Sequence, residues 1–136
     1  MLPSTIAKRD ADRDPNLIWN TFVELLAKGR YDDLSPEQRP AHLVFWYENE
    51  VQNGGHDQYF ENCGTEHLEE TITALESLGA NCQRSILRAA TKKFLAAEGD
   101  VSLSAFDTRF ENCTLSLVEH LQNHLAQHCD NFVQII

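Results

Sequence analysis

Acidic side chains dominate the middle of the sequence and could carry a binding function. Between Arg39 and Arg84 the chain contains no lysine and no arginine. The same interval contains eight carboxylates: Glu48, Glu50, Asp57, Glu61, Glu66, Glu69, Glu70 and Glu76. On a helix, Glu66 and Glu70 would lie ~6 Å apart along the axis, which is the scale of phosphate spacing along a nucleic-acid strand. We therefore predict that these eight residues bind a partner, although a solvated helix face would show the same pattern.

Basic side chains follow directly on the next helical segment. Arg84, Arg88 and Lys92 recur at every fourth position, with Lys93 beside them. They could pair with the preceding carboxylates, either within the chain or across a dimer, and such pairing would weaken the negative patch. Exposed ion pairs contribute only ~0–1 kcal/mol each. The sequence therefore leaves open whether the acidic residues are free or paired.

Three histidines near the carboxyl terminus suggest metal ligands. His120, His124 and His128 recur at every fourth position, so neighbouring members could chelate Zn²⁺ or Ni²⁺. The outer two would lie ~12 Å apart by helix rise, so one ion could not bind all three. A stable zinc site needs further protein ligands, and the sequence places none beside them. We predict a solvated or partner-facing histidine row and no metal site.

Candidate catalytic residues are few. The sequence has no GxSxG, HExxH, phosphate-binding loop or dinucleotide fingerprint. His56, next to Asp57 and near Cys63, could act as a base beside a nucleophile. The surrounding glycines and aromatic residues are better explained as turns and core anchors. We therefore predict no catalytic residue, no cofactor and no enzymatic activity.

A central helix must position most of these groups. Ser35 and Gln38 have the spacing of a capping box, and Pro36 suits the first helical position. Five large apolar or aromatic residues follow at 43–47. They cover the whole circumference of a helix, which indicates that neighbours enclose it. Asn53-Gly54-Gly55 should end it, because glycine accepts positive φ without strain.

The remaining chain is predicted to surround this helix. Apolar spacing predicts helices over 16–29, 65–78, 82–97, 104–112 and 115–128, with a helical turn over 56–62. No stretch shows the period-two pattern of a strand. We therefore predict an all-α fold, a single compact bundle of about six helices around a central buried helix. Residues 1–14 are predicted to be a mobile tail and residues 15–136 a single helical domain.

Charge and cysteine content restrict the partners and the compartment. The net charge of −10 argues against direct binding to nucleic acid or an anionic membrane. No apolar run reaches the ~20 residues of a membrane span, and residues 1–14 do not resemble a secretory signal. The four cysteines contain no CxxC pair, so reduced thiols are expected. These features favour a cytoplasmic protein.

One segment resembles a known family. Its residues are Asn53, Gly54, Gly55, Gln58, Tyr59, Phe60, Asn62 and Gly64, preceded by Glu50 and Val51. This pattern is similar to the signature of the DNA-mimic protein 19 family, and the likeness covers roughly residues 15 to 133. The resemblance implies an all-α fold and a founding member that looks like DNA in shape and charge. That founding member binds a transcription regulator and a histone-like protein and can form a homodimer, so the resemblance implies partners of this kind.

The signature residues themselves are interpreted as structural. The glycines would supply positive φ, Tyr59 and Phe60 would pack in the core, and Gln58 and Asn62 would satisfy backbone groups. The acidic residues have no comparable motif, so their roles do not transfer from the family position by position.

Together these observations favour an acidic protein-binding module. The expected function is that of a DNA mimic that occupies the basic nucleic-acid-binding surface of a partner protein. One alternative is an immunity or antitoxin-like protein that inhibits one cognate toxin, with tight and salt-resistant binding. A second alternative is a small metal-binding or enzymatic helical domain. A mimic should bind several basic proteins and weaken steeply as salt increases.

Overall fold

The computed structural model describes residues 1–136 and is built almost entirely of helices. The helices are α1 (Lys8–Arg13), α2 (Leu17–Lys28), α3 (Arg39–Cys63), α4 (Leu68–Ser77), α5 (Asn81–Ala96), α6 (Ser104–Glu111) and α7 (Leu117–His128). Two 3-10 turns, η1 (Tyr31–Asp33) and η2 (Cys129–Asn131), and two short strands, β1 (Ser4–Ile6) and β2 (Val133–Ile135), complete the chain. The predicted all-α fold is confirmed. None of the helices is long and apolar enough to cross a membrane.

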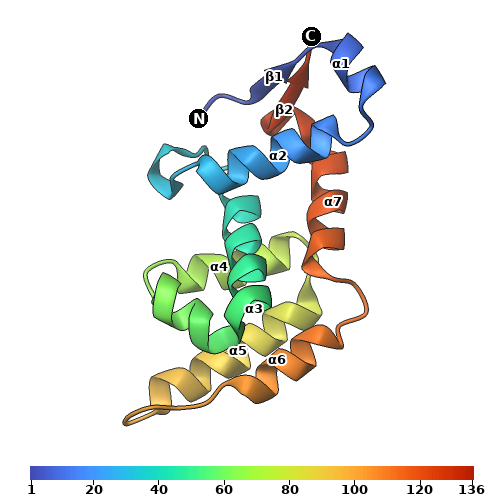
Figure 1. Ribbon diagram of the computed structural model, residues 1–136. Coiled ribbons are helices and arrows are strands. Elements are labelled where there is room, and N and C mark those ends of the chain that lie inside the picture. Colours follow the sequence, from blue (N-terminus) through green and yellow to red (C-terminus); the bar gives the residue numbers. More distant parts are fainter.

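Helix α3 is the centre of the fold, as the sequence predicted. It packs against α2, α4, α6 and α7, and Figure 1 shows it running through the middle of the molecule. The capping box before it is present, since the Ser35 backbone N–H donates to Gln38 Oε1 (3.0 Å) and the Gln38 N–H donates to Ser35 Oγ (3.3 Å). The Gln38 amide also donates to the backbone carbonyls of Met1 and Asn131. The capping residue therefore also fastens both ends of the chain.

Two glycines bend α3 where the sequence predicted an end. Gly54 (φ −155°, ψ 17°) and Gly55 (φ 75°, ψ −174°) leave the helical region, and the helix resumes in a new direction until Cys63. Only glycine adopts the Gly55 conformation without strain. Tyr59 and Phe60, on the segment after the bend, are buried as expected. The bend divides α3 into two helical segments that face different neighbours.

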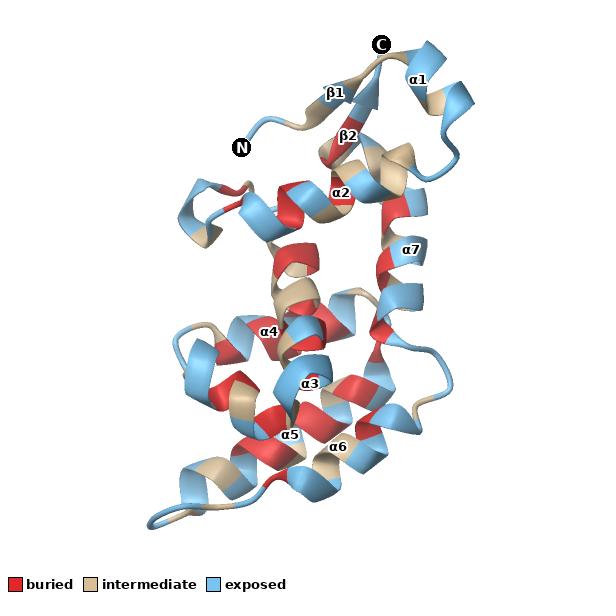
Figure 2. Ribbon diagram, viewed as in Figure 1, coloured by how far each residue is buried: buried red, intermediate tan, exposed pale blue.

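The core is one cluster of 25 buried apolar residues. Its largest fully buried members include Phe22, Tyr47, Leu75, Leu87 and Phe132, which come from α2, α3, α4, α5 and the segment before β2. Figure 2 shows the buried positions on the inward sides of the helices and the exposed positions on their outer sides. This amphipathic pattern is the one that the helical periodicity predicted.

The first residues of the chain are not a mobile tail, which corrects the sequence prediction for residues 1–14. Strand β1 pairs with β2 in parallel, with Ser4 opposite Val133 and Ile6 opposite Ile135, and α1 follows it. Both termini therefore lie at the same end of the molecule (Figure 1). The partner strand lies at the opposite end of the sequence, and three-residue strands are too short to show alternation.

The helix expected from Thr65 begins later. Residues 64–67 form turns, and α4 starts at Leu68. Thr65 makes no capping hydrogen bond, and His67 takes the position before the helix. Glu66 therefore precedes α4, and the helix-rise spacing predicted between Glu66 and Glu70 does not apply.

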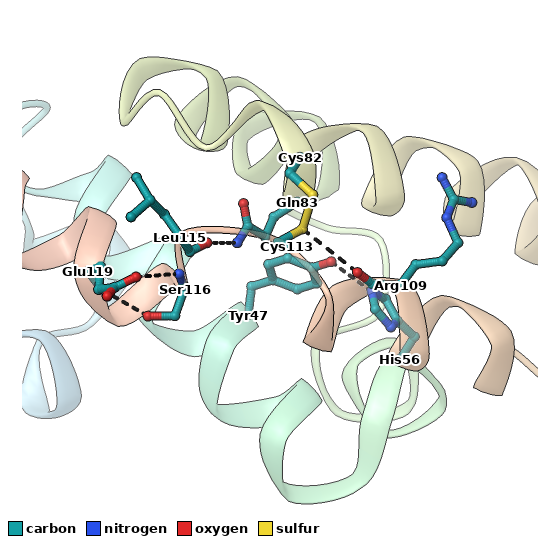
Figure 3. Close-up of a disulfide and its surroundings, with 9 residues drawn as sticks. All are labelled: Tyr47, His56, Cys82, Gln83, Arg109, Cys113, Leu115, Ser116 and Glu119. Atoms are coloured by element: carbon teal, nitrogen blue, oxygen red, sulfur yellow. Dashed lines mark hydrogen bonds between the residues drawn. A yellow bond between two sulfur atoms is a disulfide. The ribbon is translucent and has the colours of Figure 1, made fainter.

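Two cysteines form a disulfide, which corrects the expectation of reduced thiols. Cys82, at the start of α5, is bonded to Cys113, after α6, with a Cα–Cα distance of 5.9 Å. Beside it the buried Gln83 amide donates to the Leu115 carbonyl (2.6 Å) (Figure 3). Cys63 and Cys129 remain free. The disulfide and this hydrogen bond both attach α5 to the segment that leads into α7.

Candidate functional site

The eight predicted carboxylates do not form one continuous surface. Glu48 is buried between α3 and its neighbours, with 7% of the residue exposed. Burial raises the pKa of its carboxyl group, although a hydrogen bond from Gln52 opposes the shift. A group in this position is not available to a protein partner. Its burial could not be seen from helical spacing, because α3 is covered on several sides.

Two further carboxylates stabilise the bend in α3. Glu50 Oε2 accepts hydrogen bonds from the side-chain amides of Gln58 (2.9 Å) and Asn62 (2.8 Å). Asp57 Oδ1 accepts from the Leu103 backbone N–H (3.1 Å), just before α6. Gln58 and Asn62 therefore bond a carboxylate that spans the bend, and not the backbone groups that the sequence suggested. The signature glycines and amides form a single structural unit around Glu50.

One basic residue of α5 pairs with a carboxylate at one end of the predicted patch. Glu76 Oε2 lies 3.5 Å from Arg84 Nη2, so the pairing that the sequence left open occurs within the chain. Arg88 and Lys92 are exposed and contact no carboxylate. Glu61 is also exposed but belongs to another part of the surface, where it lines a pocket with Asp57 and Asp100.

Three predicted carboxylates lie at the start of α4, and two others lie on η1, which contacts this region. The Tyr31 ring stacks on the His67 ring with their centroids 3.8 Å apart, which holds η1 against this region. The His67 ring nitrogens lie 3.9 Å from both Glu66 Oε1 and Glu70 Oε2. We name this group the acidic face: Asp32, Asp33, Glu66, Glu69 and Glu70. All five are exposed, and none forms an ion pair with lysine or arginine.

The acidic face is electrostatically well placed. Glu69 and Glu70 occupy the first turn of α4, where the helix dipole favours negative charge. Arg39 lies beside the face, with its guanidinium over the Tyr31 ring (4.7 Å) and donating to the Tyr31 carbonyl. The sequence did not predict a binding role for Asp32 and Asp33, because both residues were interpreted as part of the connection between two helices. Only the Tyr31–His67 stack, which spans distant parts of the sequence, reveals their position.

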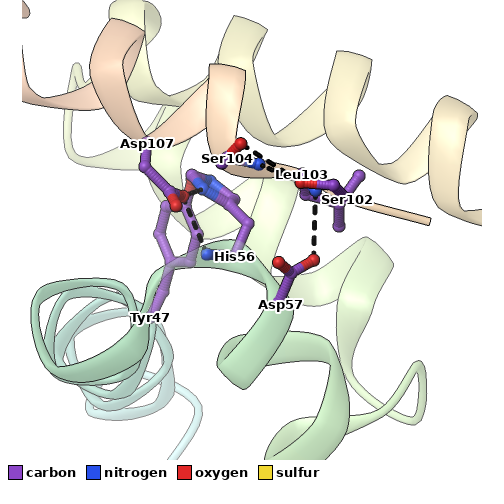
Figure 4. Close-up of polar contacts among 7 residues, drawn as sticks. All are labelled: Tyr47, His56, Asp57, Ser102, Leu103, Ser104 and Asp107. Atoms are coloured by element: carbon purple, nitrogen blue, oxygen red, sulfur yellow. Dashed lines mark hydrogen bonds and ion pairs between the residues drawn. The ribbon is translucent and has the colours of Figure 1, made fainter. Parts of the chain in front are cut away.

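A buried histidine forms the second polar cluster. His56 Nδ1 lies 2.6 Å from Asp107 Oδ1, and its Nε2 lies 2.7 Å from the Tyr47 hydroxyl (Figure 4). Burial lowers the pKa of His56, although Asp107 opposes the shift. The lowered pKa favours the neutral ring, which donates from Nδ1 to Asp107 and accepts a hydrogen bond from the Tyr47 hydroxyl at Nε2.

This cluster has the order of groups found in a catalytic relay, but it is closed to substrates. Tyr47 and His56 are both fully buried, whereas a nucleophile and its base must reach a reacting atom. The same Asp107 oxygen also accepts the His56 backbone N–H (2.8 Å). Its chemistry is thus structural, since it fastens α6 to the bend in α3. Asp107, and not Asp57 or Cys63, is the histidine's partner.

Two of the three histidines of α7 lie side by side, but no set of metal ligands surrounds them. The rings of His124 and His128 have centroids 4.6 Å apart. Burial, with a smaller contribution from His128, lowers the pKa of His124 to about 4. No group of three or more histidine, cysteine or acidic side chains has the arrangement to hold a metal ion.

Stability is expected to decrease when the pH falls below about 6.5. His42, His56 and His124 all have a lowered pKa in the fold, with burial as the largest cause. The unfolded chain then binds more protons than the folded one, so stability is present above the unfolded pKa and is lost as the pH falls. Glu48, whose pKa is raised, acts in the opposite direction. Denaturant unfolding at a series of pH values measures the effect.

The variant His124→Gln provides the control for this prediction. It should show a smaller loss of unfolding free energy between neutral pH and pH ~4 than the wild-type chain, because one titrating group is removed. The same pH dependence in both proteins would contradict the assignment of the effect to His124.

Comparison with known proteins identifies one family. The family model described as DMP19-like protein matches residues 32–131, which include the acidic face, the bend in α3 and the His56 cluster. No curated protein and no solved structure matches the chain.

Proposed function

Because the chain belongs to the DMP19-like protein family, we propose that it is a non-catalytic DNA mimic that binds the basic nucleic-acid-binding surface of another protein. The acidic face is the observation that carries this proposal. Its five carboxylates are exposed and free of lysine and arginine partners. The chain also has a net charge of −10, which would attract a cationic protein from a distance.

The mechanism is competitive occupation of a cationic surface. Carboxylates accept charge-assisted hydrogen bonds from arginine and lysine with a geometry similar to that of phosphate oxygens. Long-range attraction increases the association rate, and close contacts then determine the lifetime of the complex. The stack of Tyr31 on His67 fixes the position of η1, so part of the face needs no reordering on binding.

A charge-reversal variant tests the proposal. We expect the triple change Glu66→Lys, Glu69→Lys and Glu70→Lys to weaken binding to basic proteins captured from the native cytoplasm on the order of 100-fold, because like charges at an interface cost several kcal/mol. Affinities for each captured protein would be measured with wild-type and variant chains at several salt concentrations.

The matched control reverses three exposed carboxylates outside the acidic face: Glu98→Lys and Asp100→Lys between α5 and α6, and Glu111→Lys at the last residue of α6. This control changes the net charge equally and should retain most of the binding. Equal losses in both variants would contradict a localised site and leave only a general effect of charge. Undiminished binding of the first variant would remove the acidic face from the interface.

The cellular location and the oligomeric state of the protein also belong to the proposal. A cytoplasmic location would place the chain beside DNA-binding proteins, although the Cys82–Cys113 disulfide is unusual for a reducing compartment. A homodimer, implied by the family resemblance, also stays a prediction. An immunity-type complex with one toxin would differ from a mimic in binding one protein only and in resisting salt.

A further inference from the structure

A groove runs beside the acidic face, between the beginning of α3 and the length of α4. Its volume is about 350 Å³. Residues at every third or fourth position of both helices line it, so one stripe of each helix forms each wall. The side chains that matter here are Tyr31, Pro40, Leu43, Glu69, Glu70 and Ala74. Apolar groups thus form much of the lining, and two carboxylates stand on the α4 wall.

The groove combines two properties that suit one kind of side chain. Leu43, Pro40 and Ala74 offer apolar contact to a methylene chain, while Glu69 and Glu70 offer negative charge beside it. Long basic side chains cover apolar surface with their stems and keep their charged ends at polar groups. Neither carboxylate pairs with lysine or arginine. Arg39 also lines the groove, but its guanidinium bonds the Tyr31 and Asp32 backbone carbonyls and not Glu69 or Glu70.

Arginine fits this arrangement better than lysine. Its guanidinium has five donors in a plane, which can serve two neighbouring carboxylates, and it is less strongly hydrated than an ammonium group. The chain's own Arg39 shows that the aromatic ring of this region accepts a guanidinium, since it lies over Tyr31. Arg39 donates to the backbone carbonyls of Tyr31 and Asp32, which keeps it at the α3 wall.

We propose that the groove between α3 and α4 receives an arginine side chain of the basic partner, with its stem on Leu43 and its guanidinium at Glu69 and Glu70. This inference rests on the proposed function and adds the part of the interface that distinguishes partners. General attraction treats arginine and lysine alike, whereas a groove with an apolar floor selects between them.

Two peptides of equal length and charge provide the probe, one with arginine and one with lysine at every basic position. We expect the wild-type chain to bind the arginine peptide roughly tenfold more tightly. Thr73→Trp fills the groove from the exposed side of α4 and leaves every carboxylate in place. It should remove this preference by weakening the arginine peptide alone. Ser77→Trp fills the same wall one turn later and should act likewise.

The control Ser85→Trp adds the same ring on the exposed side of α5 and should keep the preference. Thermal unfolding of each variant confirms that it is folded. Equal affinity of the wild-type chain for both peptides, or an unchanged preference in both groove variants, would overturn the proposal that the groove binds arginine. If the reversal of Glu66, Glu69 and Glu70 still weakened binding in that case, the acidic face would remain the proposed binding surface without the groove. Unchanged binding after that reversal would overturn both proposals.

Discussion

Replacing Gly55 with alanine is expected to lower the free energy of unfolding by about 3 kcal/mol or more. Gly55 has φ 75° and ψ −174°, a region that is essentially restricted to glycine. A Cβ atom there would also meet the Asp107 carboxylate far inside normal contact distance. Asp107 cannot retreat freely, because it holds both the backbone N–H and the ring of His56.

Two other glycines separate the causes of this effect. Gly64 also has positive φ (60°), but a Cβ atom there would meet nothing within 4 Å, so Gly64→Ala should cost only the backbone strain of about 1–3 kcal/mol. Gly99 has neither feature, and Gly99→Ala should change little. Denaturant unfolding of the three variants should give losses in the order Gly55, Gly64, Gly99. A Gly55 variant as stable as the Gly99 variant would contradict the account of the bend.

Removal of the disulfide is expected to cost about 3–4 kcal/mol of unfolding free energy. Cys82 and Cys113 are 31 residues apart in sequence. The bond closes this segment into a loop and so lowers the conformational entropy of the unfolded chain. The variant Cys82→Ser with Cys113→Ser should therefore unfold at a lower temperature. The wild-type chain should show the same decrease in the presence of a thiol reductant.

The free cysteines supply the control for that experiment. Cys63→Ser changes an exposed thiol that forms no disulfide, so its unfolding temperature should stay close to the wild-type value. A reductant that left the wild-type chain unchanged would show that the bond contributes nothing to stability.

Local features of the fold could be predicted from the sequence. Leu17, Phe22 and Leu25 recur at helical spacing, and α2 forms there. The capping box of Ser35 and Gln38 is present, and the pair Gly54-Gly55 interrupts α3. Each of these signals depends on residues that are close in sequence, where propensity and backbone geometry act directly.

Features that depend on distant residues could not be predicted. His56 meets Asp107 across 51 positions, and neither residue lies in a motif that indicates the other. Cys82 and Cys113 come together only because α5 packs against α6. Glu48 was expected to be exposed because charged side chains usually face solvent, yet α3 is covered on the side where Glu48 lies. Long-range packing decides each of these cases.

The candidate site was predicted in part for the same reason. Glu69 and Glu70 follow the helical pattern of α4 and are exposed as expected. Glu50 and Asp57 are used within the fold, because a carboxylate next to free backbone or amide donors is readily bound by them. Asp32 joins the acidic face through the contact of Tyr31 with His67, which the linear order does not suggest.

Competition with DNA tests the central claim most directly. A basic DNA-binding protein captured by the immobilised chain would be exposed to increasing concentrations of double-stranded DNA, at a salt concentration where the complex is stable. Because the mimic and DNA would occupy the same cationic surface, the DNA should release the captured protein in proportion to that protein's affinity for DNA. If salt released the captured protein but saturating DNA did not, the acidic face would bind that protein outside its DNA-binding surface. This result would contradict mimicry.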